Sequence, residues 1–429
     1  MTYTEAVDYI FQHLPMFTKI GGVAYKADLS RTLYLCEKLG NPHLNFRSIH
    51  IAGTNGKGSV ASFLSSIFME SGSKTALFTS PHLRDFRERI TINGILIPGD
   101  YVAEFIEENR PNFETIQPSF FEMSFALAVK WFSDQKVDVA IIETGMGGRL
   151  DSTNVILPEI SIITNIGLDH QQFLGSTLAE IAAEKAGIIK PNIPVVIGEH
   201  NQQTDRVFIE KAIQTHSLLF WAEDLSSVED SFYDVENNYL NLSLMILSGK
   251  LIQLQSPLPA EYEIKNIRTV MAAAEVLNQS GYSLSDEILA NGIKNVLKNT
   301  GLKGRWQILS KNPLIVADIS HNEPGIKELM KQLNKLKYNH LHFVLGMVSD
   351  KDSFSILQLF PKEATYYFCQ PNIPRGKDVE QLADEAHEFG LQGKIFHSVE
   401  EAFRTACASA LADDIVLISG SAFVVAEII

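Results

Sequence analysis

A short glycine-rich stretch, Gly-Thr-Asn-Gly-Lys-Gly-Ser, carries the residue types that bind phosphate. Gly53, Gly56 and Gly58 let the backbone turn tightly, so that its N–H groups can approach an anion closely. Lys57 adds a positive charge, and Ser59 adds a hydroxyl that suits a metal ion. Together these residue types predict a loop that holds the phosphates of a nucleotide.

The loop departs from the strict phosphate-loop pattern, Gly-x-x-x-x-Gly-Lys-Ser/Thr. Ile51 stands at the position of the first glycine, and Gly58 is inserted between Lys57 and Ser59. The alternative interpretation is an ordinary glycine-rich turn with a surface lysine. Nucleotide binding is preferred because the stretch follows an apolar strand and precedes a helix whose apolar residues share one face.

A lysine on a later helix also has the character of a functional residue. Thr177 and Glu180 form a capping-box pattern, which predicts that a helix starts there. Lys185 falls on the same face as Ile181 and Ala182, so it points inward. A buried ammonium is costly without a partner. The lysine is therefore either a snorkelling or acid-paired residue, or a chemically modified residue that coordinates the site.

The elements that position these residues are those of an α/β sheet. Apolar runs predict strands at residues 48–52, 74–79, 137–143 and 160–164. Strands of this kind alternating with helices imply a doubly wound, mostly parallel sheet, whose ligands bind at the carboxyl ends of the strands. Glu143 and His170 lie at such ends. With Ser59 they form a donor set suited to magnesium beside ATP, although their spacing alone is weak evidence.

The second half of the chain predicts a separate domain. We expect a β-rich excursion at residues 199–262, a helix at 264–277 and an interdomain linker at 298–303. A second α/β alternation follows, with strands near residues 314–319, 342–346, 365–370, 394–397 and 415–419. The fold class is thus a phosphate-loop domain, residues 1–297, and a smaller Rossmann-like domain, residues 304–429. Residues 1–46 are expected to be helical, with a break at Gly21-Gly22.

Composition limits the classes of partner. The chain has 429 residues, 45% of them hydrophobic and 20% charged, and a formal net charge of −15. Such a charge argues against broad binding of nucleic acid or anionic membrane. Cys36, Cys369 and Cys407 show no metal-ligand spacing, which suits packing residues in a reducing compartment. The N-terminus shows no signal-peptide pattern, so we expect a cytoplasmic protein. We also expect a monomer that binds neither nucleic acid nor membrane.

Several motifs, in this order, resemble the folylpolyglutamate synthase and dihydrofolate synthase family of the Mur ligase-like superfamily. The resemblance spans nearly the whole chain. The motifs are Gly-Thr-Asn-Gly-Lys-Gly-Ser at 53–59, Thr-Ser-Pro-His-Leu at 79–83, Glu-Arg-Ile-x-Ile-Asn-Gly at 88–94, Glu-Thr-Gly-Met-Gly-Gly-Arg-Leu-Asp at 143–151, Leu-Asp-His at 168–170, Glu-Lys-Ala-Gly-Ile at 184–188, Gly-Arg at 304–305, Asp-x-x-His-Asn at 318–322 and Gly-Ser-x-Phe-Val at 420–424.

The resemblance implies ATP-dependent amide ligation. ATP would phosphorylate a carboxylate of dihydropteroate or a reduced folate, and the amine of L-glutamate would attack the acyl phosphate through a tetrahedral intermediate. The implied cofactors are ATP and two Mg²⁺ ions, the first on Ser59 and Glu143 and the second on Glu143, His170 and a carbamylated Lys185. Lys57 would join Glu143, His170 and Lys185 as the catalytic group.

The resemblance also assigns binding residues. The ATP site would consist of Thr54, Asn55, Gly56, Lys57, Gly58, Ser59, Val60, Asn266, Arg305, Asp318 and His321. The pterin or glutamate end would be near Ser80, Pro81, His82, Phe121 and Asp151.

The chain departs from the family pattern at two places. Tyr262-Glu263 stand where the family usually has His-Gln, which affects the expected adenine-side contact. Ile319 and Glu323 replace a glycine and a proline. Two alternatives therefore stay open. One is a Mur ligase acting on a nucleotide-linked sugar, which shares the loop but usually places a further domain before it. The other is a nucleotide-binding regulatory protein without catalysis. The sequence leaves the preferred folate and the glutamate chain length open.

Overall fold

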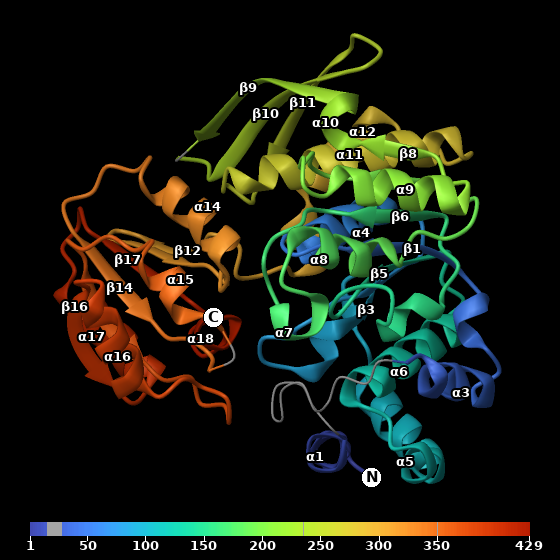
Figure 1. Cartoon of the computed structure of the whole chain (residues 1–429), viewed down its shortest axis with the longest axis horizontal. Helices are drawn as coiled ribbons and strands as arrows, with labels where there is room; N and C mark the ends of the chain where they lie inside the picture. Colours follow the sequence, from blue (N-terminus) through green and yellow to red (C-terminus); the bar gives the residue numbers. More distant parts are fainter. Residues whose placement is uncertain (15–27, 235, 350) are drawn as a thin grey trace. The chain divides into compact units, whose positions relative to one another are not determined.

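The computed structural model describes residues 1–14, 28–234, 236–349 and 351–429. The predicted break at Gly21-Gly22 lies outside these residues. The chain divides into two compact units, Met1–Leu302 and Lys303–Ile429 (Figure 1). No helix among the described residues is long and apolar enough to cross a membrane.

An eight-stranded sheet with strand order β4-β3-β2-β5-β1-β6-β7-β8 forms the frame of the first unit. The strands are β1 (Arg47–Ala52), β2 (Thr75–Phe78), β3 (Ile90–Ile92), β4 (Ile95–Leu96), β5 (Val139–Glu143), β6 (Ile160–Ile163), β7 (Val195–Ile197) and β8 (Leu219–Trp221). Only β3 and β4 run antiparallel to their neighbours. The predicted doubly wound, mostly parallel sheet is confirmed.

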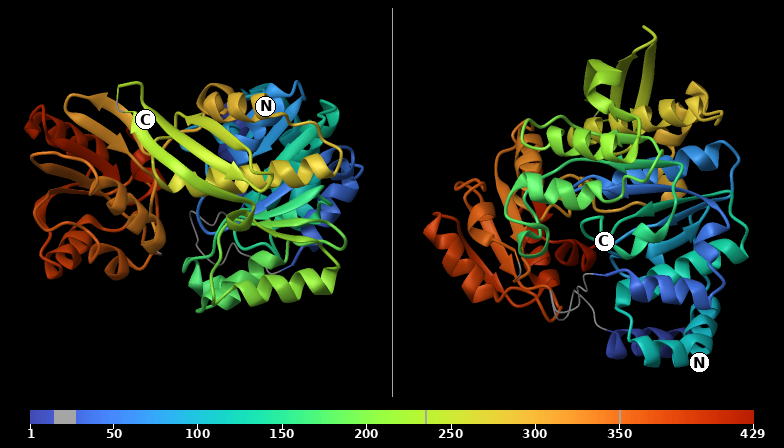
Figure 2. Two further views of the ribbon diagram at one scale, coloured as in Figure 1. Left: turned by 90° about the horizontal axis from the view of Figure 1, so that it is seen from above. Right: turned by 45° about the vertical axis from the view of Figure 1, so that its right-hand side comes forward.

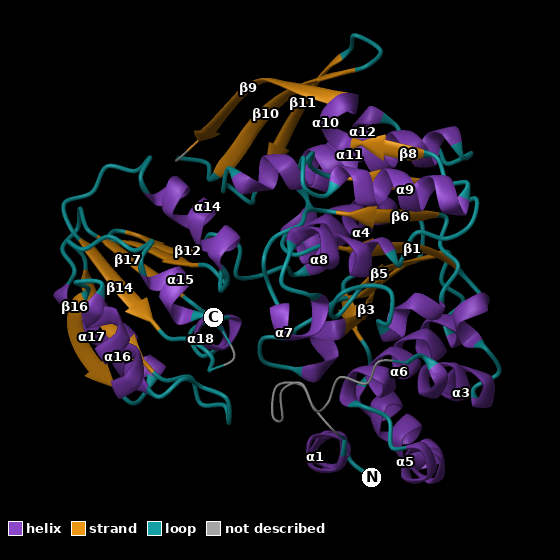
Figure 3. Cartoon of the chain, in the orientation of Figure 1, coloured by secondary structure: helices purple, strands orange, loops and turns teal. Residues whose placement is uncertain are grey.

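Helices cover both faces of this sheet (Figure 3). One face packs against α4 (Lys57–Glu70), α11 (Tyr262–Gln279), α12 (Asp286–Lys294) and α13 (Val296–Thr300). The other packs against α1 (Tyr3–His13), α3 (Ser30–Lys38), α5 (Gly99–Ile116) and α6 (Phe120–Asp134). The pleat of the strands explains this division: Ile141 of β5 faces the α4 side, whereas Ala140 and Ile142 face the α6 side. The remaining helices of this part are α7 (Gln171–Leu174), α8 (Leu178–Ala186), α9 (Asp205–Thr215) and α10 (Ala222–Leu225).

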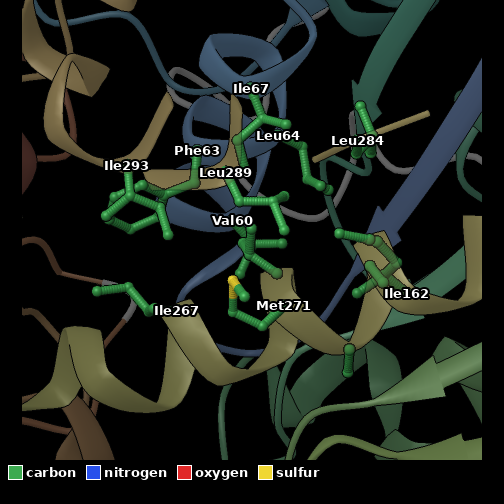
Figure 4. Close-up of a cluster of buried hydrophobic side chains, with 14 of the residues drawn as sticks. Val60, Phe63, Leu64, Ile67, Ile162, Ile267, Met271, Leu284, Leu289 and Ile293 are labelled. Atoms are coloured by element: carbon green, nitrogen blue, oxygen red, sulfur yellow. The ribbon is translucent and has the colours of Figure 1, made fainter. Parts of the chain in front are cut away.

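Helix α4 is more deeply buried than its sequence pattern predicts. Every residue from 58 to 68 is buried, and this includes Ser59, Ser62 and Ser66, which do not belong to the apolar face. Helices α11 and α12 both pack against α4, and Figure 4 shows their apolar residues, among them Met271 and Leu289, beside Val60. Ser66 Oγ donates a hydrogen bond of 2.6 Å to the carbonyl of Gly292 in α12. The predicted apolar residues lie in one core cluster, and contacts with α11 and α12 bury the serines of α4 as well.

The expected β-rich excursion is confirmed in its second half only. Strands β9 (Ser226–Asp234), β10 (Tyr239–Ile246) and β11 (Leu251–Ser256) form an antiparallel sheet that stands beside α11 and α12 (Figure 2). Residues 205–221 instead contain helix α9 and the edge strand β8 of the main sheet. Residues 298–300, expected in the linker, are the end of α13.

The second unit has a six-stranded sheet with strand order β12-β13-β17-β14-β15-β16. Its strands are β12 (Gln307–Lys311), β13 (Leu314–Ala317), β14 (Leu341–Leu345), β15 (Thr365–Cys369), β16 (Gln392–Phe396) and β17 (Ile415–Ser419). Its helices are α14 (Glu323–Leu333), α15 (Ser353–Leu357), α16 (Val379–Glu388), α17 (Val399–Ser409) and α18 (Ala422–Ala426). All pairs are parallel except β12 with β13, and β12 has no counterpart among the predicted strands.

Candidate functional site

The predicted phosphate loop connects β1 to α4 at the carboxyl edge of the main sheet. Thr54 N donates to the carbonyl of Asn165 at 2.9 Å, and Asn55 N donates to the side-chain oxygen of the same residue at 2.9 Å. Gly167 N donates to Thr54 Oγ1 at 3.0 Å. The loop is therefore held by the segment that follows β6, the neighbouring strand.

Two of the three glycines are required by this geometry. Gly53 has φ +150°, and a Cβ there would lie 1.8 Å from Thr164 Oγ1. Gly56 has φ +82°, and a Cβ there would lie 2.2 Å from Asn266 Oδ1. Gly58 is the second residue of α4, so the turn does not use it. The prediction that all three glycines shape the turn was therefore wrong for Gly58.

Two lysines meet at the start of the loop. Lys57 Nζ donates to the carbonyl oxygens of Gly53 at 3.0 Å and Thr54 at 3.1 Å. Lys185 Nζ donates to the same Gly53 oxygen at 2.8 Å, and this lysine is only 4% exposed. The inward orientation predicted for Lys185 is confirmed, as is the capping box of Thr177 on α8. Burial, together with the charge of Lys57, lowers the pKa of Lys185 to about 7.

Ser59 has a partner that the sequence did not predict. Its Oγ donates at 2.8 Å to Oε1 of Glu263, which is completely buried in α11. Asn266 Nδ2 donates at 2.8 Å to the other carboxylate oxygen, Oε2. Glu263, noted in the sequence only as a departure from a family pattern, thus connects a predicted metal ligand to a predicted ATP-binding residue. Ser59 and Glu263 are 204 residues apart in the chain, so no local sequence pattern predicts their contact.

Of the predicted metal ligands, Ser59 lies in α4, Glu143 at the end of β5 and Lys185 in α8. Glu143 ends β5 beside Ile51 of β1, is 3% exposed, and accepts a hydrogen bond from Ser80 N at 3.0 Å. His170 precedes α7 with φ +50°, just after β6. Within the described ranges, no group of three or more His, Cys, Asp and Glu side chains is arranged to hold a metal ion. The hydroxyl of Ser59, the carboxylate of Glu143 and the imidazole of His170 nevertheless fit a hard divalent cation by donor chemistry.

Arg89 is a buried arginine that was not among the predicted site residues. Arg89 is 5% exposed, donates from Nε to His82 Nδ1 at 2.7 Å, and lies 5.0 Å from the centroid of the Phe120 ring. Burial lowers the pKa of Arg89 to about 10, opposed by the charge of Glu143. Burial also lowers the pKa of His82 to about 3, so this imidazole is neutral. An arginine in a short 3-10 helix of four residues gives no periodic signal of burial.

Asp151, predicted near the substrate, has its carboxylate occupied by the protein. Oδ2 accepts from the N–H groups of Gly145 and Met146, both at 2.9 Å, and Oδ1 accepts from Thr153 N at 3.0 Å and Oγ1 at 2.5 Å. The ring of Phe121 packs against the same loop, 2.7 Å from where a Cβ of Gly145 would lie. Asp151 therefore holds the glycine-rich loop after β5 in place above Phe121.

Three predicted ATP-binding residues lie in the second unit. Asp318 is 1% exposed, and its carboxylate accepts hydrogen bonds from Trp306 N at 2.8 Å and Ser320 N at 2.9 Å. His321 Nδ1 contacts the carbonyl of Ile319 at 2.9 Å. Arg305 Nη1 lies 3.3 Å from the carbonyl of Lys303. Within this unit, Asp318 joins the segment after residue 304 to the loop after β13.

Comparisons with known proteins agree with this architecture. Residues 51–274 match the Mur ligase middle domain, and residues 304–422 match the Mur ligase glutamate ligase domain. The folylpolyglutamate synthase of Lacticaseibacillus casei is 32% identical over 439 residues, which cover 100% of this chain and 98% of that protein. A probable bifunctional folylpolyglutamate synthase/dihydropteroate synthase of Haloferax volcanii is 31% identical over 434 residues, and the chain spans half the length of that relative.

Solved structures give the same result. Escherichia coli FolC in complex with DHPP and ADP has a TM-score of 0.86 and 29% identity, over 100% of this chain and 97% of that one. A bifunctional folylpolyglutamate synthase/dihydrofolate synthase with Mn, AMPPNP and L-glutamate bound has a TM-score of 0.84 and 27% identity, over 100% and 97%. The fold and the loop define an ATP-dependent acid–amino-acid ligase of the Mur ligase type. Within that class, the chain belongs to the folylpolyglutamate synthase/dihydrofolate synthase family.

Proposed function

We propose that this protein uses ATP to join L-glutamate to dihydropteroate, to reduced folates or to both, through an acyl phosphate. The observation that carries the proposal is the pair of lysines, Lys57 and Lys185, at the phosphate loop of a chain whose whole length matches this family. Related structures contain ADP with DHPP, or AMPPNP with L-glutamate, which supports the same substrates here.

The first task of the residues is to bind the triphosphate. The N–H groups at the start of α4 and the ammonium of Lys57 provide positive charge where the phosphates would bind. The segment from Thr54 to Val60 forms this half of the nucleotide site, and Asn266 lies against it at Gly56. Arg305, Asp318 and His321 would contribute the other half from the second unit.

The second task is to hold divalent cations, whose charge offsets that of the phosphoryl group during transfer. Ser59 and Glu143 would hold one Mg²⁺, and Glu143, His170 and a carbamylated Lys185 would hold a second. Carbamylation joins the neutral amine to carbon dioxide and releases a proton. The burial of Lys185, which lowers its pKa to about 7, favours the neutral amine that this reaction needs.

The third task is to bind the acceptor. Ser80, Pro81, His82, Phe121 and Asp151 would surround the pterin or glutamate end. We add Arg89, because a guanidinium that is 95% buried beside a neutral imidazole can hold the acceptor's carboxylate or its acyl phosphate. A site closed to water would protect the acyl phosphate from hydrolysis.

The test is a ligation assay with ATP, radiolabelled glutamate and two acceptors, dihydropteroate and a reduced folate, with product chain length read by mass spectrometry. We expect Mg²⁺-dependent glutamate incorporation with at least one acceptor. Turnover of a UDP-linked sugar with neither pteroate nor folate would identify a Mur ligase instead. Nucleotide binding without turnover of any acceptor would identify a regulatory protein.

A further inference from the structure

A buried carboxylate lies directly behind the phosphate loop. Glu263 has no exposed surface, and its two oxygens accept hydrogen bonds from Ser59 Oγ and Asn266 Nδ2, each at 2.8 Å. Ser59 is one turn into α4, and Asn266 touches Gly56 at the entrance to that helix. Glu263 therefore contacts both sides of the loop through two polar side chains.

The chemistry of a carboxylate fixes the direction of both contacts. An ionised carboxylate only accepts hydrogen bonds, so the hydroxyl proton of Ser59 must point toward Glu263. This leaves the lone pairs of Ser59 available to a cation. For the same reason Asn266 must turn its amide nitrogen toward Glu263, and its Oδ1 is the atom that faces Gly56. The carboxylate of Glu263 thus fixes which hydrogen-bonding atoms of Ser59 and Asn266 face the phosphate loop.

We propose that Glu263 is a positioning residue for the metal–nucleotide complex: it holds Ser59 as a cation ligand and turns the carbonyl of Asn266 toward the phosphate loop. The inference deepens the proposed function and rests on it for the identity of the ligands, a nucleoside triphosphate and a divalent cation.

A glutamine at this position would act differently. Its amide offers one acceptor and one donor group, so it can accept from Ser59 or from Asn266 but not from both. If the amide oxygen keeps Ser59, then the amide nitrogen faces Asn266, and Asn266 must reverse its own amide. The acid at position 263 therefore orients both neighbours, which an amide at the same position cannot do.

The test measures the binding of a non-hydrolysable ATP analogue by calorimetry, with saturating Mg²⁺ and with a chelator. In Glu263→Ala, we expect the gain in affinity that Mg²⁺ provides to fall about tenfold, as for loss of a charge-assisted hydrogen bond, with little change in the metal-free affinity. Glu263→Gln keeps the volume and one acceptor, so it should lose less of this gain. If Glu263→Ala does not fold, Glu263→Gln alone decides.

Two further variants make the result specific. In a Ser59→Ala background, Glu263→Ala should cause no additional loss of Mg²⁺ dependence, because its effect passes through Ser59. Glu385→Gln is the matched control. Glu385 is a largely buried acid paired with Lys377 in the other unit, so its replacement should leave the Mg²⁺ dependence unchanged.

The proposal is overturned if Glu263→Ala and Glu263→Gln lower affinity equally with and without Mg²⁺, which is the result expected of a purely structural hydrogen bond. It is also overturned if the double variant loses the sum of what Ser59→Ala and Glu263→Ala each lose of the Mg²⁺-dependent gain in affinity. Because the binding assay contains neither acceptor nor glutamate, its outcome is independent of whether the ligation assay finds the expected activity.

Discussion

The side chains of Lys57 and Lys185 donate hydrogen bonds to one and the same oxygen, the carbonyl of Gly53, at 3.0 and 2.8 Å. Two ammonium groups that share an acceptor repel each other, and the repulsion contributes to the low pKa of the buried lysine. Lys57 reaches Gly53 by folding back from the first residue of α4, whereas Lys185 comes from α8. The phosphate loop thus joins two cations of different exposure, and we expect them to have different functions.

Lys57 is expected to act on the nucleotide. Replacing it by alanine removes a positive charge from the loop, and we expect kcat/KM for ATP to fall by about 10² to 10³. Lys57→Arg keeps the charge and should lose less. Steady-state kinetics, with thermal unfolding to confirm the fold, measure this. Equal losses in the alanine and arginine variants would show that the shape of the lysine matters more than its charge.

Lys185 makes stability depend on pH in a defined direction. Its pKa is about 7 in the folded protein and near 10.5 when unfolded, so between these values the unfolded chain binds the additional proton. The free energy of unfolding should therefore rise with pH from about 7 to 10.5, at up to about 1.4 kcal/mol per unit.

The comparison that isolates this effect is Lys185→Met, whose unbranched side chain is one atom shorter and carries no charge. Denaturant unfolding is measured in buffers free of carbon dioxide. The free energy of unfolding should rise less with pH in the variant than in the wild type. If the free energy of unfolding rises equally with pH in the two proteins, Lys185 is charged in the folded state across this pH range.

Carbamylation of Lys185 predicts dependence on carbon dioxide. Removing bicarbonate from the buffer should lower ligation activity, and adding it back should restore activity in the wild type but not in Lys185→Ala. A carbon-13 signal from labelled bicarbonate, present in the wild type and absent in the variant, is the direct readout. Unchanged activity in Lys185→Ala would refute the carbamate.

The sequence was informative wherever one segment carries its own pattern. Apolar runs predicted β1, β5 and β6, and the capping box predicted the start of α8 together with the inward face of Lys185. Contacts between distant segments could not be predicted in this way. The polar side of α4 is covered by α11 and α12, which come much later in the chain. Ser59 donates a hydrogen bond to Glu263 of α11, 204 residues away.

The same limit applies to Asp151, whose role near the substrate stays a prediction. Its motif indicated a substrate contact, but four donors from the backbone and Thr153 surround its carboxylate, and a pattern of residue types does not show which partners a side chain has already found. Arg89 is the opposite case, because it lay within a quoted motif and had no assigned role until its burial was known.

Gly53 and Gly72 allow a matched test of the loop. Both have positive φ, +150° and +85°, but a Cβ at Gly53 would meet Thr164 Oγ1 at 1.8 Å, whereas nothing lies within 4 Å of one at Gly72. Gly72→Ala should cost about 1 to 2 kcal/mol from backbone strain alone and leave activity intact. Gly53→Ala should cost more stability and weaken ATP binding.

Removing the clashing hydroxyl then tests the cause of that loss. Thr164→Ala combined with Gly53→Ala should recover part of the stability, as measured by denaturant unfolding, but not all of it, since the backbone strain remains. A double variant as unstable as the sum of the two single variants would show that the clash with Thr164 is not the origin of the loss.

Arg89 and Arg87 lie two residues apart on one turn and provide the last comparison. Arg89 is buried against His82 and Phe120, whereas Arg87 is partly exposed and paired with Asp85 at 2.7 Å. If Arg89 holds the acceptor's carboxylate or acyl phosphate, Arg89→Met should raise KM for the acceptor about tenfold or more and leave KM for ATP unchanged. Stability should also fall, because methionine is smaller than arginine and leaves Nδ1 of His82 without its donor. Arg87→Met should leave both KM values unchanged. Acceptor kinetics that stay at the wild-type level in Arg89→Met, with a loss of stability, would instead make Arg89 a structural cation that fixes the imidazole of His82.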